Sequence, residues 1–212
     1  MGLFEMHCHL LPDIDDSKVP TDGLPRVLEI YRECGFTGIV FTPHIYNPYV
    51  HTRTEAIRDV WERAKVIAGE KGLKVYLGSE LFIGDQDPVR TIPFAGKYAL
   101  VEFPTTLPLP GWYERLASLV EQGFTPMVAH VERYCWLSVD GPDFARIRKL
   151  GCLIQVNVEG VADGTALPYL EADVVDVMAT DNHGVEETLP ARLVEERYSW
   201  PKVFDRMEAL GL

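Results

Sequence analysis

The sequence predicts an α/β fold built around a parallel sheet, most simply a barrel closed with fewer than eight strand–helix units. Apolar, strand-like runs alternate with helix-like segments about seven times along the chain. Glycine also follows four of the predicted helices, at Gly35, Gly72, Gly123 and Gly151, directly before an apolar run. Because glycine readily adopts the left-handed conformation that closes a helix, these junctions indicate repeated returns from helix to strand.

Seven segments have the composition of strands. Several are continuous apolar runs, such as 38–41 and 127–129, which suit parallel strands buried on both faces. An open doubly wound sheet is the alternative, but no glycine-rich phosphate loop follows the first strand. The predicted strands cover residues 3–9, 37–42, 74–79, 97–102, 125–129, 153–157 and 174–180.

The helices between these strands carry start signals. Thr21 precedes the first, and Thr52 with Glu55 lies in a stretch that predicts a capping box before the second. Pro190 is well placed for the first turn of a later helix. The predicted helices cover residues 22–33, 56–70, 112–121, 143–150, 191–198 and 202–210.

Length and composition predict a single domain over residues 1–212, since 212 residues suffice for a sizeable core. The net charge of −12 argues against a nucleic-acid partner and suits a protein that uses carboxylates to hold cations. No apolar run is long enough to span a bilayer and no signal peptide is recognisable, so we expect a cytoplasmic protein without membrane insertion. The four scattered cysteines suggest neither a disulfide framework nor a zinc ribbon.

Every predicted strand ends in a polar or metal-capable residue. His7 and His9 point to the same face of the first strand, because side chains alternate along a strand. Five of the six histidines lie at strand ends, and only His51 does not. In a parallel barrel these ends meet at the face where active sites form. The strand-end residues are His7, His9, Thr42, His44, Ser79, Glu80, Glu102, His130, Asn157, Thr180, Asp181 and His183.

This joint placement predicts a metal centre. Imidazole and carboxylate ligands without thiolate suit manganese, iron or zinc in a hydrolytic site. The donors outnumber what one ion needs, since a catalytic zinc takes about three protein ligands. We therefore expect two or three divalent ions, with a carboxylate bridging one pair.

Seven motifs occur in an order that resembles the polymerase and histidinol phosphatase (PHP) superfamily. The most similar branch is that of the manganese-dependent bacterial protein-tyrosine phosphatases, which act on the tyrosine kinases of capsule and exopolysaccharide synthesis. The motifs are HCHLLPDIDD at 7–16, TPH at 42–44, GSEL at 78–81, LVEFP at 100–104, AHVERY at 129–134, QVN at 155–157 and ATDNH at 179–183.

The resemblance implies a distorted (β/α)7 TIM-like barrel that holds three metal ions at the C-terminal ends of its strands. By this analogy, one ion would be held by His7, His9, Glu80 and Asp181. A second would be held by Glu80, Glu102 and His130, with Glu80 bridging, and a third by Asp16, His44 and His183. A metal-bridging hydroxide would then attack the phosphate monoester.

The same resemblance assigns roles outside the ligand set. Arg133 would bind a phosphate oxygen, for which its planar guanidinium is suited, and Asn157 would give a supporting hydrogen bond. Arg133, Glu80 and His44 are the expected catalytic residues. A surface salt bridge to Glu132 is the alternative role for Arg133.

Departures from the family pattern leave every expected ligand in place. They are Glu5 for aspartate, Asp13 and Ser17 for glycine, Val131 for proline and Asn182 for alanine. The loop 45–51 is aromatic, whereas relatives tend to carry a more basic loop there. It either lines the substrate mouth or packs as an ordinary loop.

The sequence argues against two other phosphatase chemistries. No cysteine has an arginine six positions on, which excludes a cysteine-based phosphatase loop. Asp13 resembles an aspartate nucleophile only superficially, because the histidines and Pro12 separate it from the buried strand. A phosphatase of a small metabolite such as histidinol phosphate, and a metal-bound but inactive regulatory partner of a kinase, remain as alternatives. The expected partner is accordingly a phosphorylated protein, such as a bacterial tyrosine kinase, or a small phosphate monoester.

Overall fold

The computed structural model describes residues 2–212 and places their strands in two parallel sheets. The three-stranded sheet has the order β1-β2-β4, and the six-stranded sheet has the order β3-β5-β6-β7-β8-β9. Every strand pair in both sheets is parallel, as the buried apolar runs predict. The strands are β1 (Leu3–Cys8), β2 (Phe36–Phe41), β3 (His44–Ile45), β4 (Lys74–Leu77), β5 (Glu80–Phe82), β6 (Tyr98–Glu102), β7 (Thr125–Val128), β8 (Leu153–Asn157) and β9 (Val177–Ala179).

Two of the seven predicted strands, 37–42 and 74–79, end earlier than expected, and each is followed after a two-residue break by a short further strand. Thr42 and Pro43 separate β2 from β3, and Pro43 lacks the N–H that a strand ladder requires. Gly78 and Ser79 separate β4 from β5. Backbone bonds continue across the break, from Gly78 N–H to the Phe41 carbonyl at 2.8 Å and from Glu80 N–H to the Pro43 carbonyl at 3.0 Å. We therefore count β2 with β3, and β4 with β5, as one strand each in the barrel, and call each such unit a strand line.

The first and last strand lines meet at their C-terminal ends. The Asp181 N–H donates to the His7 carbonyl at 2.9 Å, and the His9 N–H donates to the Asn182 carbonyl at 2.8 Å. A parallel bridge between Cys8 and Asn182 lies at the same place. Seven strand lines thus form a distorted barrel that is joined at this seam by only a few backbone bonds.

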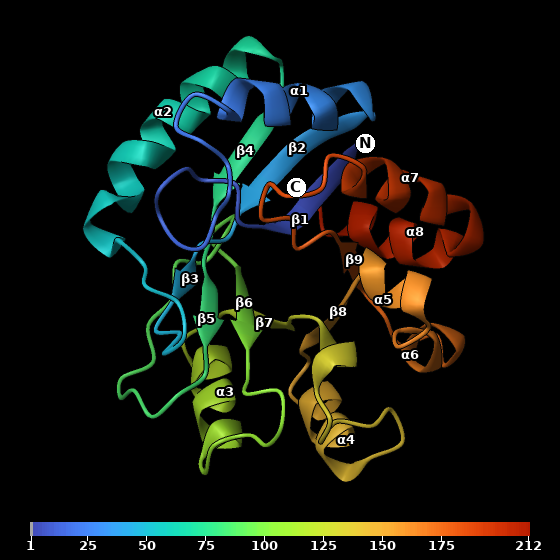
Figure 1. The fold of residues 1–212 in the computed structure, drawn as a ribbon. Coiled ribbons are helices and arrows are strands. Elements are labelled where there is room, and N and C mark those ends of the chain that lie inside the picture. The colour runs from blue at the N-terminus through green and yellow to red at the C-terminus, as the bar shows by residue number, and fades with distance from the viewer. Residues whose placement is uncertain (1) are drawn as a thin grey trace.

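Helices surround the strands (Figure 1), with α1 and α2 packed along the three-stranded sheet. The six predicted helices are found with boundaries that agree to within two residues. Two further short helices, α5 and α6, follow β8 and were not predicted. The helices are α1 (Leu24–Glu33), α2 (Ile57–Glu70), α3 (Trp112–Glu121), α4 (Pro142–Lys149), α5 (Val158–Asp163), α6 (Leu167–Glu171), α7 (Leu189–Ser199) and α8 (Pro201–Ala209), with 3-10 turns at Thr54–Ala56 and Val131–Arg133.

The structure confirms the predicted glycine and proline signals at helix ends and contradicts the predicted capping box. The four junction glycines adopt φ angles between 71° and 90°, so the predicted left-handed closures are confirmed. Pro190 lies in the first turn of α7, as predicted. The capping box is wrong, because a 3-10 turn precedes α2 and neither element receives a side-chain cap. The N–H of Arg53 instead donates to the Ile14 carbonyl at 2.8 Å, which ties this turn to the loop after β1.

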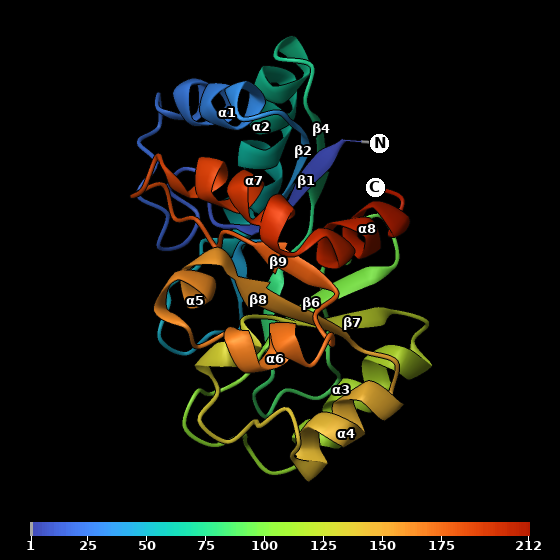
Figure 2. The same ribbon diagram turned by 90° about the vertical axis from the view of Figure 1, so that its right-hand side faces the viewer.

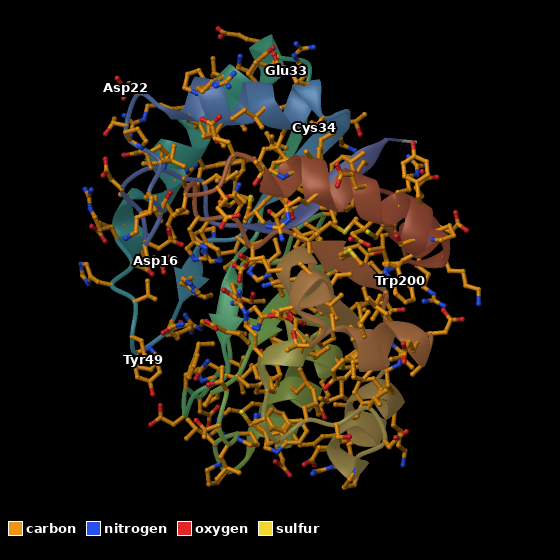
Figure 3. The ribbon with its side chains drawn as sticks, turned by 45° about the vertical axis from the view of Figure 1, so that its right-hand side comes forward. Asp16, Asp22, Glu33, Cys34, Tyr49 and Trp200 are labelled. Carbon is orange, nitrogen blue, oxygen red and sulfur yellow. The ribbon has the colours of Figure 1, made fainter. Side chains whose placement is uncertain are left out.

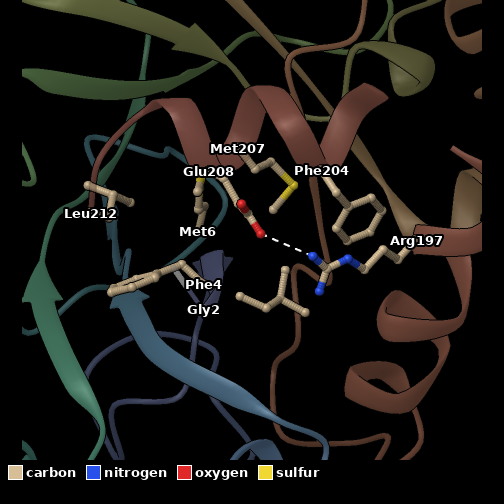
Figure 4. A pocket seen from close by; sticks show the side chains of 9 residues that line it. Gly2, Phe4, Met6, Arg197, Phe204, Met207, Glu208 and Leu212 are labelled. Carbon is tan, nitrogen blue, oxygen red and sulfur yellow. Dashed lines mark hydrogen bonds and ion pairs between the residues drawn. The ribbon is translucent and has the colours of Figure 1, made fainter. Parts of the chain in front are cut away.

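The N-terminal end of the barrel is an apolar packing region. Both chain ends lie on that side of the molecule, opposite the loop that follows β1 (Figure 2). A cavity of about 10 Å³ remains between β1 and α8, lined by Phe4, Met6, Phe204 and Met207. An ion pair between α7 and α8 closes its rim (Figure 4). No helix within residues 2–212 is long and apolar enough to cross a membrane.

Candidate metal centre

The C-terminal strand ends bring all nine predicted metal ligands into one cluster. Their donor atoms fall into four overlapping groups, and within each group the atoms lie within 4.8 Å of one another. Seven of the nine residues are buried, whereas Asp16 and His183 lie at the partly exposed edge. The groups are His9, Asp16, His44 and His183; His7, His130 and Asp181; His7, His9 and Glu80; and His44, Glu80 and Glu102.

Glu80, the first residue of β5, is the central carboxylate of the cluster. Its oxygens lie 2.8 Å from His130 Nε2, 3.0 Å from His44 Nδ1, and 3.3 Å from Nε2 of both His7 and His9. Burial alone would raise the pKa of Glu80, but the charge of His7 and the hydrogen bonds of His130 and His44 hold that pKa well below its usual value. A carboxylate that faces four imidazoles is suited to bridge two cations.

The hydrogen bonds of His7 and His9 indicate which ring nitrogens are free to bind metal. His7 Nδ1 lies 3.1 Å from Gln155 Oε1, and His9 Nδ1 lies 2.8 Å from Asp15 Oδ2. Because both partners are acceptors, each Nδ1 carries the proton. The two Nε2 atoms then face each other at 3.3 Å with Glu80 beside them. Two facing lone pairs repel unless a proton or a cation lies between them, so these residues fit a divalent metal.

The grouping of the outer ligands differs from the expected one at two residues. Asp16, His44 and His183 share a group as expected, and His9 joins them. Glu102, however, lies 3.1 Å from His44, and His130 is grouped with His7 and Asp181 rather than with Glu102. The Asn47 amide donates to Glu102 Oε1 at 2.7 Å, which holds this carboxylate on the His44 side.

Two of the clustered residues have unusual backbone conformations. His130 has a φ angle of 32° and Asp181 one of 50°, both in the left-handed region that non-glycine residues seldom occupy. Each follows the end of a strand, β7 or β9, and turns its side chain into the cluster. Such strain persists where the surrounding structure fixes it, and it commonly marks functional sites.

Arg133 reaches the cluster from the turn after His130. Its Nη1 lies 2.7 Å from Asp181 Oδ2, and 44 % of its side chain is exposed. The alternative salt bridge to Glu132 does not form. Glu132 instead accepts a hydrogen bond from the Asn157 N–H at 3.0 Å. The Asn157 amide in turn donates to Asp181 Oδ2 at 3.1 Å, so the two predicted substrate-side residues converge on one carboxylate.

Comparison with known proteins decides the family. The family described as "Capsular polysaccharide synthesis, CpsB/CapC" matches residues 3–198. The chain belongs to the CpsB/CapC family. This match confirms the branch of phosphatases of capsule synthesis that the motifs resemble.

Two named tyrosine-protein phosphatases resemble this CpsB/CapC chain over most of its length. Tyrosine-protein phosphatase CpsB of Streptococcus pneumoniae is 26 % identical over 209 residues, which cover 89 % of this chain and 86 % of that protein. Tyrosine-protein phosphatase YwqE of Bacillus subtilis is 25 % identical over 201 residues, covering 87 % of this chain and 78 % of that protein.

Two solved structures share the fold of this CpsB/CapC chain. A crystal structure from the work on YwqE of Bacillus subtilis and CpsB of Streptococcus pneumoniae, described as metal-dependent tyrosine phosphatases, matches with a TM-score of 0.76 and 22 % identity. It covers 94 % of this chain and 92 % of that one. Histidinol phosphate phosphatase of Lactococcus lactis, complexed with zinc, histidinol and phosphate, matches with a TM-score of 0.57 and 13 % identity, covering 96 % and 93 %.

Gln155 and Asp15 have covered side chains that orient the ligands of this CpsB/CapC chain, and neither was identified as such from the sequence. Gln155 Oε1 accepts hydrogen bonds from the His7 ring and from the His130 N–H at 2.8 Å, while its Nε2 donates to Asn157 Oδ1 at 2.7 Å. Asp15 accepts from the His9 ring and from the His44 N–H at 3.1 Å. Strand alternation places Gln155 on the same face as Asn157, which was an available signal. Asp15 lies in a loop, where no periodicity applies.

Gln155→Met should weaken metal binding about 10-fold to 100-fold, the usual effect of removing a residue that orients a ligand. Methionine keeps the volume but leaves the His7 and His130 N–H groups without their acceptor. Isothermal titration with manganese measures the affinity, and a thermal melt of the metal-free variant checks that it folds. Unchanged manganese affinity in a folded variant would contradict the orienting role. Gln122→Met, on the surface end of α3, is the matched control.

Proposed function

We propose that this chain is a metal-dependent phosphatase that removes phosphate from tyrosine residues of proteins. The observation that supports this proposal most strongly is the cluster of nine imidazole and carboxylate residues, seven of them buried, in which the Nε2 atoms of His7 and His9 face each other beside Glu80. Membership of the CpsB/CapC family supports the same function, because the named relatives are tyrosine-protein phosphatases.

Two or three divalent ions would fit the donor set. Imidazole and carboxylate ligands suit manganese, and iron or zinc are the alternatives. The proposed ligands are His7, His9, Asp16, His44, Glu80, Glu102, His130, Asp181 and His183. When bound, the ions would act as Lewis acids on the phosphoryl oxygens and lower the pKa of a shared water.

Arg133 is proposed to bind the phosphate of the substrate. Its guanidinium lies at the edge of the cluster and is partly open to solvent, so an incoming phosphate can reach it. A phosphoryl group would compete with Asp181 for the same donor atoms, because both present oxygens of negative charge. The Asn157 side chain also donates a hydrogen bond to Asp181 Oδ2. This bond keeps the carboxylate in the cluster when Arg133 turns to the substrate.

The leaving group of phosphotyrosine suits this site. The phenol of tyrosine has a pKa of about 10, so phenolate leaves more easily than an alkoxide and makes little demand on a general acid. The thiol of Cys8 takes no part, because it is fully buried, donates to the Val40 carbonyl at 3.4 Å, and has a pKa that burial raises well above the usual value.

Arg133→Ala should raise the KM for a phosphotyrosine peptide about 10-fold to 100-fold, since a charge-assisted hydrogen bond to phosphate is lost. Arg133→Lys should recover only part of this loss, because an ammonium cannot form the two parallel bonds of a guanidinium. Steady-state kinetics with manganese present measure both variants. Arg58→Ala, on the exposed face of α2, serves as control. Wild-type kinetics in Arg133→Ala would remove this residue from the site.

The proposed partner is a phosphorylated protein, and a bacterial tyrosine kinase of capsule synthesis is the specific candidate. Family membership supports this choice, because the matching family is described by its part in capsular polysaccharide synthesis. A small phosphate monoester such as histidinol phosphate and a purely regulatory role are the two competing readings.

One experiment separates these readings. The purified protein is analysed for bound metals and then assayed, with and without manganese, on a phosphotyrosine peptide, histidinol phosphate and a generic aryl phosphate. The proposal expects bound or readily loaded metal and a preference for the phosphotyrosine peptide. A preference for histidinol phosphate would favour the metabolite phosphatase, and metal without hydrolysis would favour the regulatory role. A protein that takes up no divalent metal would overturn the proposal altogether.

A further inference from the structure

Exposed apolar side chains lie in the loops at the barrel face that carries the metal centre. Among residues 2–212, five of the seven large hydrophobic side chains that are exposed lie in loops that follow strands at this face. Tyr49 is the most exposed of the five, at 85 %. Figure 3 shows Tyr49 on the same side of the molecule as Asp16, a residue of the cluster. The five are Tyr46, Tyr49, Leu107, Leu109 and Val185.

The Tyr49 loop is attached directly to the metal centre through Asn47. The Asn47 side chain donates to Glu102 Oε1 at 2.7 Å, and its Oδ1 accepts the N–H of Tyr49 at 2.9 Å. One amide therefore connects a proposed metal ligand to the backbone of Tyr49. Tyr46 has a φ angle of 60°, so the chain turns sharply just after His44. These contacts hold the backbone of Tyr49 near the cluster.

The Tyr49 ring has one aromatic neighbour and much free surface. Its centroid lies 6.5 Å from that of Phe82, with the rings nearly perpendicular at 81°. Phe82 pairs with Glu102 across β5 and β6, so the ring pair lies beside the strand end that carries this ligand. An aromatic side chain that is held at the edge of an active site but largely exposed is suited to contact a second ring.

We propose that Tyr49 is a specificity-determining residue that packs against the aromatic ring of an aryl phosphate, with phosphotyrosine as the physiological class. This inference rests on the proposed phosphatase function and extends it to the basis of substrate choice. The phosphate enters the cluster, and the ring to which it is ester-linked passes the edge where Tyr49 stands. Alkyl phosphates lack the ring and gain nothing from this contact. Discrimination therefore arises from Tyr49, and catalysis from the cluster behind it.

The test compares binding of phenylphosphonate and methylphosphonate to the manganese-loaded protein by isothermal titration. Neither compound is hydrolysed, so the measurement does not depend on turnover. Loss of one aromatic contact corresponds to roughly a threefold to tenfold change in affinity. Tyr49→Ala should weaken phenylphosphonate binding by that factor and leave methylphosphonate binding unchanged. Tyr49→Phe should restore the wild-type ratio, because the ring is retained without the hydroxyl.

Further variants separate this contact from general effects. Tyr198→Ala removes an equally exposed tyrosine from α7 and should change neither affinity. Asn47→Ala leaves the Tyr49 ring but releases its loop, and it should lose part of the preference for the aryl compound. Equal losses for both phosphonates in Tyr49→Ala, or no loss, would overturn the inference. A wild-type protein that prefers phenylphosphonate but does not hydrolyse phosphotyrosine would refute the proposed function and leave the Tyr49 contact standing.

Discussion

Replacing Glu80 with glutamine should lower the rate of phosphotyrosine hydrolysis about a hundredfold to a thousandfold. Glu80 faces His7, His9, His44 and His130 at 2.8–3.3 Å and belongs to two of the four ligand groups. Glutamine keeps the shape but removes the charge, and its NH₂ group places donors where lone pairs are needed. Losses of this size follow when one preorganised electrostatic group is removed from an active site.

Metal analysis tests this prediction together with kinetics. We expect Glu80→Gln to bind less manganese than the wild type, in addition to its lower kcat. Glu114→Gln, on the exposed first turn of α3, should match the wild type in both measurements. A Glu80→Gln variant with full metal content and full activity would exclude the bridging role of this carboxylate.

Saturation with manganese should raise the melting temperature by about 10 °C. Ions that bind only the folded state at a thousand times their Kd stabilise it by about 4 kcal/mol. Each kcal/mol corresponds to about 2–4 °C for a chain of this size. The gain arises because the cluster is assembled from side chains of six of the seven strand lines only when the protein is folded. Chelation should reverse the shift and abolish hydrolysis, and differential scanning calorimetry with parallel assays measures both.

The manganese-induced gain should shrink as the pH falls from 8 to 6. Burial opposes the charged form of His44, but Glu102 and Glu80 outweigh it and raise its pKa to about 10 in the metal-free protein. This proton must leave before His44 can bind metal, so apparent affinity falls about tenfold per pH unit for each proton released. In the metal-free protein, the stabilisation from protonated His44 is complete below about pH 6.5 and disappears as the pH rises through 10.

Melting curves at pH 6, 7 and 8, with and without manganese, measure this dependence. His51 provides the matched control, since it is the one histidine of the sequence outside the cluster. His51→Ala should keep both the gain and its pH dependence, whereas His44→Ala should reduce both. A gain that is independent of pH would show that no histidine proton is displaced.

The sequence predicted the cluster well because its cause is topological. Side chains at the ends of parallel strands must meet at one face, whatever the details of packing. Knowing that His44, Glu80 and His130 follow strands was therefore enough to place them together. The pairing of Glu102 with His44 was not predictable in this way, since it depends on the Asn47 side chain in a loop.

Local signals failed where tertiary contacts override them. The Thr52–Glu55 stretch has the residue types of a capping box, yet the backbone there is held by the loop after β1. Helices α5 and α6 are only 6 and 5 residues long, too short for a 3.6-residue period to stand out. Strand alternation indicates which face Gln155 points to, but its contact with His7 and His130 depends on tertiary hydrogen bonds that the sequence does not show.

Few backbone hydrogen bonds join β1 to the residues that follow β9, so the barrel is weakly closed at this seam. The backbone bonds that join its two sides involve His7, His9, Asp181 and Asn182, and three of these four residues are also proposed ligands. An ion held from both sides would fasten the beginning of the chain to a segment near its end. Amide hydrogens along this seam should therefore exchange with solvent faster after chelation than those in the continuous β6–β7 ladder. The metal would then stabilise the closure of the barrel in addition to supporting hydrolysis.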